Sequence, residues 1–259
     1  MFSDLSDLIF ALGLSAPRIA AAFLILPLLT QETVPALVRN VLFVSLALIV
    51  VPLTSYGLQS VPTANIVWPF IVIKELFIGA SIGFLFGAIF WAVSIAGGVI
   101  DTQAGANMAN AMDPVQGHQS SPNSRWLAQF ASWLFMVSGG LLIFVDLLLT
   151  SYQLYPVTAP LPSLSHIGMQ IYLGEFNYIM TTALLLAAPV VLLLALVDLC
   201  FGLVNRFAQE LNVLSITMPV KSWVAVLILM LNLGLIVEII LRKLMDNKTL
   251  LNTLEQGLL

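Results

Sequence analysis

The sequence predicts an all-α, polytopic membrane protein with about six apolar helical segments arranged in bent hairpins. Of its 259 residues, 60% are hydrophobic and only 8% are charged, and the mean hydropathy is +1.03. A soluble domain carries about 25% charged residues, so this chain cannot cover a water-facing surface of its size. Its apolar runs approach bilayer length, and none shows the period-2 alternation of a barrel strand.

The first three apolar segments cover residues 8–29, 38–52 and 66–98. A helix needs about 20 apolar residues to cross the hydrocarbon of a bilayer, so the second segment is short for a crossing. The third is long enough to be either a tilted helix or a helix that breaks near Pro69. The first two segments are expected to form a hairpin.

The last three apolar segments cover residues 126–150, 177–204 and 220–241, and the last two are expected to form a second hairpin. The connection 151–176 contains three prolines, which favour extended or turn backbone. We expect one membrane domain over residues 1–259. It comprises four helices in 1–150 with a polar loop at 99–125, a connection and hairpin in 151–241, and a tail at 242–259.

The charges in the connections do not give one simple topology. Basic residues expected on the inner side under the positive-inside rule are Arg39, Arg125, Arg206 and Lys221. Six crossings would then place the basic tail, with Arg242 and Lys243, on the outer side. We therefore expect that one segment does not cross fully, or that the chain is not inserted as an ordinary multispan protein.

Several charges interrupt the apolar segments, and Arg18, Glu75 and Asp198 are the hardest to place near an interface. Each would cost about 3 kcal/mol at the centre of a bilayer by insertion scales. They are expected either to make buried polar contacts with another helix or subunit, or to line a substrate or proton pathway. Glu238 and Arg242 are four residues apart, so these two are expected to pair locally.

A ladder of small residues, Gly79, Gly83 and Gly87, lies within the third segment. Glycines four residues apart fall near one face of a helix and let another backbone approach closely. The ladder therefore predicts tight helix packing at this face, and it names no function.

The chain offers little chemistry for catalysis. It contains no H-E-x-x-H, G-x-S-x-G, Walker A or G-x-G-x-x-G motif, and only two histidines and one cysteine, Cys200. Asp101 and Asp113 share a polar loop, but the Asp-Pro pair at 113–114 is more typical of a turn than of a cation site. We expect no enzyme activity, no cofactor and no metal. With nine lysines and arginines and a net charge of −4, we expect no nucleic-acid partner either.

Two stretches of sequence resemble a known family. The first reads Gly-Gly-Val-Ile-Asp-Thr-Gln-Ala-Gly-Ala-Asn-Met-Ala over residues 97–109, and the second reads Asn-Arg-Phe-Ala-Gln-Glu-Leu-Asn-Val over residues 205–213, followed by Met-Pro-Val-Lys-Ser at 218–222. Together they resemble the FliR/SctT family, the export-apparatus membrane proteins of type III secretion systems. The chain departs from the family pattern at Gln209-Glu210 and at Leu214. The Met-Pro-x-Lys-Ser version resembles virulence-type members more than flagellar ones.

The resemblance implies a non-catalytic pore or gate subunit in the bacterial inner membrane, through which unfolded secreted proteins pass. It implies a helical, closed hetero-oligomer with several copies of two smaller membrane subunits, raised in part toward the periplasm. A switch subunit of the export apparatus and membrane lipid are the further partners it implies.

The resemblance also assigns candidate sites. The polar loop is a candidate pore plug, small and uncharged apart from one aspartate, although a plain solvated loop is the alternative. Its candidate residues are Met108, Ala109, Asn110, Ala111, Met112, Asp113, Pro114, Val115, Gln116, Gly117 and His118. Arg206 and Lys221, at the tip of the last hairpin, are candidates for subunit contact or for the cytoplasmic-side entrance.

Two other functions stay open on the residues alone. A small-molecule or ion transporter would use Arg18, Glu75 and Asp198 as its site. A membrane-embedded enzyme is the least supported, because no nucleophile–base pair is present. A transporter should purify as a self-contained protein, whereas an export subunit should need other chains.

Overall fold

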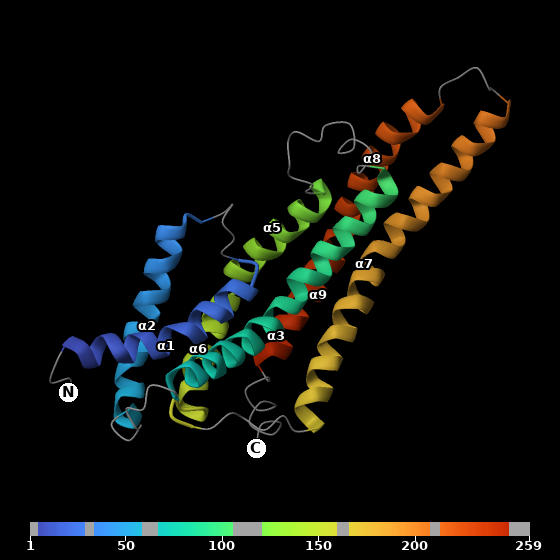
Figure 1. Ribbon diagram of the computed structural model, residues 1–259. Coiled ribbons are helices and arrows are strands. Elements are labelled where there is room, and N and C mark those ends of the chain that lie inside the picture. The colour runs from blue at the N-terminus through green and yellow to red at the C-terminus, as the bar shows by residue number, and fades with distance from the viewer. Residues whose placement is uncertain are drawn as a thin grey trace. The chain divides into compact units, whose positions relative to one another are not determined.

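The computed structural model describes residues 5–28, 34–58, 67–105, 121–159, 166–207 and 213–248 (Figure 1). Every regular element within these ranges is a helix, which confirms the all-α prediction for the described part of the chain. The helices are α1 (Leu5–Ile25), α2 (Ala36–Leu58), α3 (Val67–Ala104), α5 (Pro122–Val137), α6 (Gly140–Leu154), α7 (His166–Phe207), α8 (Val213–Leu231) and α9 (Leu233–Lys248).

The fourth and sixth predicted segments are each interrupted, so in the described part of the chain six segments correspond to eight helices. Between α5 and α6, Gly139 takes a left-handed φ of 79°, which glycine adopts without the strain of a Cβ. Between α8 and α9, the Asn232 side chain donates to the Ile228 carbonyl at 2.8 Å. The break considered near Pro69 is absent, because this proline lies in the first turn of α3, where helix N–H groups have no partner within the helix.

Two helices are long and apolar enough to cross a membrane by length and composition, over Trp68–Ala104 and Gly168–Phe207. The number rises to four if α5 with α6, and α8 with α9, each count as one bent span. Within the described residues this is fewer than six full crossings. In α1 and α2 the described apolar stretches, Ala11–Ile25 and Ala36–Pro52, are shorter than the about 20 residues that a crossing needs.

The chain forms two compact units that are interleaved along the sequence. The first contains Met1–Gly87, Gly139–Leu173 and Met245–Leu259, and the second contains Ala88–Ser138 and Gly174–Leu244. In the first unit, the ring of Phe144 on α6 packs edge-on against Phe23 and Phe86, with ring centroids 5.0 and 5.2 Å apart. In the second unit, Phe90 on α3 packs against Phe135 on α5 at 5.3 Å.

Two glycines of the predicted ladder bring α3 against the backbone of α1 in the first unit. A Cβ on Gly79 would overlap the carbonyl oxygen of Arg18, and one on Gly83 would lie 2.5 Å from the carbonyl oxygen of Ala22. Gly87 is buried further along the same helix. The close approach places Arg18 of α1 beside α3, and the polar cluster described next depends on it.

Candidate functional site

Arg18 and Glu75 form a buried ion pair between α1 and α3 in the first unit. The Arg18 Nε lies 2.7 Å from Glu75 Oε2, and Arg18 Nη2 lies 3.0 Å from Oε1. Both side chains are 0% exposed. The two parallel hydrogen bonds use the planar guanidinium as a fork, which is the strongest form of this contact.

Arg18 also caps the C-terminal end of α6. Its Nη1 donates to the Ser151 carbonyl at 2.8 Å, and its Nη2 donates to the Tyr155 carbonyl at 2.8 Å. The last carbonyls of a helix have no partner within the helix and carry partial negative charge, so a cation there is favourable. The guanidinium lies 4.1 Å from the centroid of the Tyr152 ring, which adds a cation–π contact.

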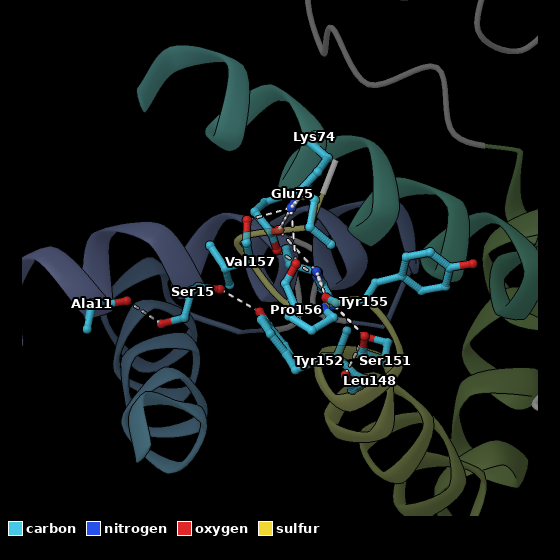
Figure 2. Close-up of polar contacts among 12 residues, drawn as sticks. Ala11, Ser15, Lys74, Glu75, Leu148, Ser151, Tyr152, Tyr155, Pro156 and Val157 are labelled. Carbon is cyan, nitrogen blue, oxygen red and sulfur yellow. Dashed lines mark hydrogen bonds and ion pairs between the residues drawn. The ribbon is translucent and has the colours of Figure 1, made fainter. Parts of the chain in front are cut away.

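Lys74 holds the connection that follows α6 (Figure 2). Its ammonium donates to the carbonyls of Val157, Ala159 and Pro156, at 2.6, 2.9 and 3.2 Å. It also lies 3.2 Å from Glu75 Oε1. A compact ammonium with rotatable donors suits several carbonyls that converge on one point. The turn at 155–159 is therefore folded around a lysine side chain of α3.

The cluster of Arg18, Lys74 and Glu75 contains two cations and one carboxylate. The excess positive charge faces the carbonyls at the end of α6 and in the turn after it. Buried charges are tolerated when they are paired and hydrogen-bonded. The Tyr152 hydroxyl adds a hydrogen bond to the Ser15 carbonyl at 2.5 Å (Figure 2), so the cluster joins α1, α3 and α6.

Replacing Lys74 by methionine is expected to lower the free energy of unfolding by about 2 kcal/mol. The Val157 carbonyl is buried and would lose its donor, a loss that costs about 1–3 kcal/mol. Lys74→Arg should not restore stability, since a planar guanidinium cannot aim at the same point. Unfolding by sodium dodecyl sulfate in mixed micelles measures both variants, with Arg242→Met as an exposed control. Wild-type stability of Lys74→Arg would contradict the requirement for an ammonium.

In the second unit, Asp198 joins the two motif stretches. Lys221 lies 2.8 Å from Asp198 Oδ1 and donates to Oδ2 at 2.9 Å, and Gln103 Nε2 donates to Oδ2 at 3.3 Å. Gln103 belongs to the first stretch and Lys221 to the second. The Asp198 side chain is 42% exposed, so this contact is only partly buried, unlike the Arg18–Glu75 pair.

The remaining predicted site residues lie either on the surface of a helix or outside the described residues. Arg206 is exposed in the last turn of α7. The predicted Glu238–Arg242 pair is confirmed at 3.3 Å on the surface of α9. All of the candidate plug residues 108–118 lie outside the described residues.

Sequence reasoning missed two further contacts. Lys243 of α9 pairs with Glu175 of α7 at 2.6 Å and lies 4.3 Å from the centroid of the Tyr178 ring. Asp101 of α3 accepts hydrogen bonds from the start of α5. Both partners are distant in sequence, and the only available signal was a charged residue within or beside an apolar segment.

These charged groups mostly serve to join helices. Among the described residues, no group of three or more histidine, cysteine, aspartate or glutamate side chains could hold a metal ion. The donors of Arg18 and Lys74 point at protein acceptors from α3, α6 and the following turn. The fold and these clusters define an apolar, all-helical protein whose buried charges connect its helices.

Residues 9–246 match the family described as bacterial export proteins, family 1, and the chain belongs to that family. It is 33% identical to the surface presentation of antigens protein SpaR of Salmonella typhimurium, over 89% of this chain and 86% of the relative. It is 33% identical to the Yop proteins translocation protein T of Yersinia pestis, over 83% and 82%. These matches confirm the family resemblance, and the virulence systems of these two relatives fit the virulence-type version of the motif at 218–222.

A flagellar relative is also similar. The flagellar biosynthetic protein FliR of Bacillus subtilis is 29% identical, over 92% of this chain and 92% of its own length. Relatives named for virulence and for flagella therefore align along nearly the whole chain, so the likeness covers both compact units.

Proposed function

We propose that this protein is a subunit of a type III secretion export apparatus of the virulence type, located in the bacterial inner membrane. Its role there is to form part of the wall of the pore through which unfolded protein substrates pass, with no catalysis of its own. The observation that carries the proposal is the alignment with SpaR and with Yop translocation protein T along more than four fifths of the chain.

The surface of α7 supports a role in a hetero-oligomer. Within the second unit, exposed apolar side chains follow this helix from Phe176 to Phe207, a length of about 47 Å at 1.5 Å per residue. The hydrocarbon of a bilayer is only about 30 Å thick, so lipid alone cannot cover the full length of this apolar face. We propose that several copies of two smaller membrane subunits cover the remainder, with a switch subunit and membrane lipid as further neighbours and with part of the assembly raised toward the periplasm.

Native mass spectrometry tests this assignment. The tagged chain is expressed with and without its genomic neighbours and purified from membranes. We expect one large hetero-oligomer that contains this chain only when the neighbours are present. A stable complex of this chain alone that binds a solute would overturn the proposal and favour a transporter with Arg18, Glu75 and Asp198 as its site.

The segment 108–118 is proposed as the plug that keeps the pore closed to small solutes. Its composition supports this role, because a small segment with one charge is displaced by a substrate without breaking strong ion pairs. Arg206, at the exposed end of α7, is proposed as a contact with neighbouring subunits at the entrance. Lys221 is buried in its pair with Asp198, so we propose that it acts there by holding the partly exposed Asp198 side chain.

Deleting residues 108–118 is expected to make the inner membrane leaky to small solutes. This deletion keeps Ser121 at the N-cap of α5, so the helix that follows is left unchanged. A Gly-Ser replacement of the same length serves as the matched variant and separates the effect of loop length from that of residue identity. Solute uptake measures the leak, and an intact assembly without leakage would show that the segment is not a plug.

A further inference from the structure

The start of α5 is capped by a residue of another helix. Ser121 occupies the N-cap position of α5, but its side chain makes no capping hydrogen bond. Instead, Asp101 Oδ2 on α3 accepts from the backbone N–H groups of Asn123 and Ser124, at 2.9 and 3.3 Å. Asn123 and Ser124 are the second and third residues of α5. An N-cap side chain ordinarily accepts a hydrogen bond from the backbone N–H at these positions.

Asp101 is buried, with 1% of its surface exposed. Its second oxygen, Oδ1, accepts from Asn123 Nδ2 at 2.6 Å. Three N–H donors and the partial positive charge at the start of α5 therefore compensate for the buried carboxylate. Removing the start of α5 from this place would leave the carboxylate without these donors.

One face of α3 is shaped to receive the start of α5. Gly97 leaves room for it, since a Cβ there would lie 2.6 Å from the backbone nitrogen of Ser124. The Ser124 hydroxyl donates to the Ser94 carbonyl at 2.7 Å, and the two serine hydroxyl oxygens are 2.8 Å apart. Ser94, Gly97 and Asp101 are spaced at three and four residues and share this face, which we call the α5 seat.

We propose that Asp101 is a positioning residue that makes the first turn of α5 depend on contact with the α5 seat. A cap within α5 would let its first turn stay formed away from α3. A cap supplied by α3 is lost when the contact is lost, so helix start and docking form and break together. Asp101 thereby fixes the point from which the chain enters α5. The inference rests on the proposed function only for its biological readout, secretion.

Disulfide formation between Ser94→Cys and Ser124→Cys reports whether α5 is docked. The hydroxyl oxygens they replace are 2.8 Å apart, so the two side chains point toward one another as a disulfide requires, and Cys200→Ser removes the only native thiol. The measurement uses the full chain in native membranes with its genomic neighbours. We expect Asp101→Ala to reduce the fraction cross-linked in a short oxidation at least fivefold.

Ser121→Asp separates positioning from capping, because it offers a carboxylate cap from within α5 to the same two N–H groups. In the double variant Asp101→Ala, Ser121→Asp, we expect the midpoint of thermal unfolding to recover, while cross-linking and secretion stay low. If cross-linking and secretion recover as well, Asp101 is only a cap and the proposal is wrong. Unchanged cross-linking in Asp101→Ala alone would also overturn it.

Asp101→Asn covers the case in which the alanine variant does not accumulate. It keeps the size of the side chain and one acceptor oxygen, so we expect a level of cross-linking between wild type and alanine. Wild-type cross-linking with asparagine would contradict the need for a carboxylate. Cross-linking does not depend on secretion, so a strain that secretes normally without this protein would remove the proposed function and leave the role of Asp101 standing.

Discussion

Glu75→Ala is expected to lower the free energy of unfolding by about 3–5 kcal/mol, the cost of breaking a buried ion pair by removing one partner. The guanidinium of Arg18 would stay at 0% exposure without its carboxylate, and the ammonium of Lys74 would remain beside it. Native proteins have total free energies of unfolding of about 5–15 kcal/mol, so this loss would remove a large share of the stability. Unfolding by sodium dodecyl sulfate in mixed micelles measures the change, and the amount of protein in the membrane should fall with it.

Glu238→Ala is the matched control for Glu75→Ala. It removes the same side chain from an ion pair with Arg242 that is two-thirds or more exposed on both sides. Exposed pairs contribute about 0–1 kcal/mol, so its effect should be several times smaller. Similar losses for the two variants would show that burial does not set the strength of the Arg18–Glu75 pair.

Gly79→Ala is expected to destabilise the first unit by about 3 kcal/mol, at the upper end of the cost of overpacking. The added Cβ would overlap the Arg18 carbonyl oxygen and lie 2.8 Å from the carbonyl carbon. Both atoms are backbone, so a side-chain rotation cannot relieve the clash and α1 must move away from α3. That movement also pulls Arg18 from Glu75, which couples the glycine to the charged cluster.

Gly98→Ala on the same helix is the control for this prediction. The nearest atom to a Cβ at position 98 is the Ser121 hydroxyl oxygen at 3.9 Å, an ordinary contact. Alanine is the better helix former by about 1 kcal/mol, so this variant should be neutral or slightly stabilising. Thermal unfolding of both variants gives the comparison, and equal midpoints would rule out close backbone packing at Gly79.

The sequence indicated which residues need partners but not which partners they have. Arg18 and Glu75 stood out because charges are costly inside apolar segments, and the structure pairs them across 57 residues. Lys74 lies beside Glu75 in the same apolar segment, but its three carbonyl partners follow α6 and no local spacing predicts them. Ion pairs four residues apart, such as Glu238–Arg242, were predictable because a helix alone brings them together.

The helix boundaries were likewise predicted only in part from the sequence. The apolar segments located the helices, but the interruptions at Gly139 and at Asn232 were not foreseen. A single glycine or asparagine in an apolar run is a weak signal, since either is tolerated within a helix at a cost of about 1 kcal/mol or less. The cap on α5 was equally hidden, because Ser121 looks like an ordinary N-cap residue while Asp101 supplies the hydrogen bonds.

By itself the sequence determined the class of this protein, because composition and apolar length decide which solvent a chain can face and two motif stretches identify the family. The tertiary structure alone decided the partners of the buried charges. Arg18 meets Glu75 only after Gly79 lets α1 and α3 touch, and Asp198 meets Gln103 and Lys221 only when three helices assemble. Hydrogen bonds act over about 3 Å, so such partnerships depend on packing, which local sequence spacing does not encode.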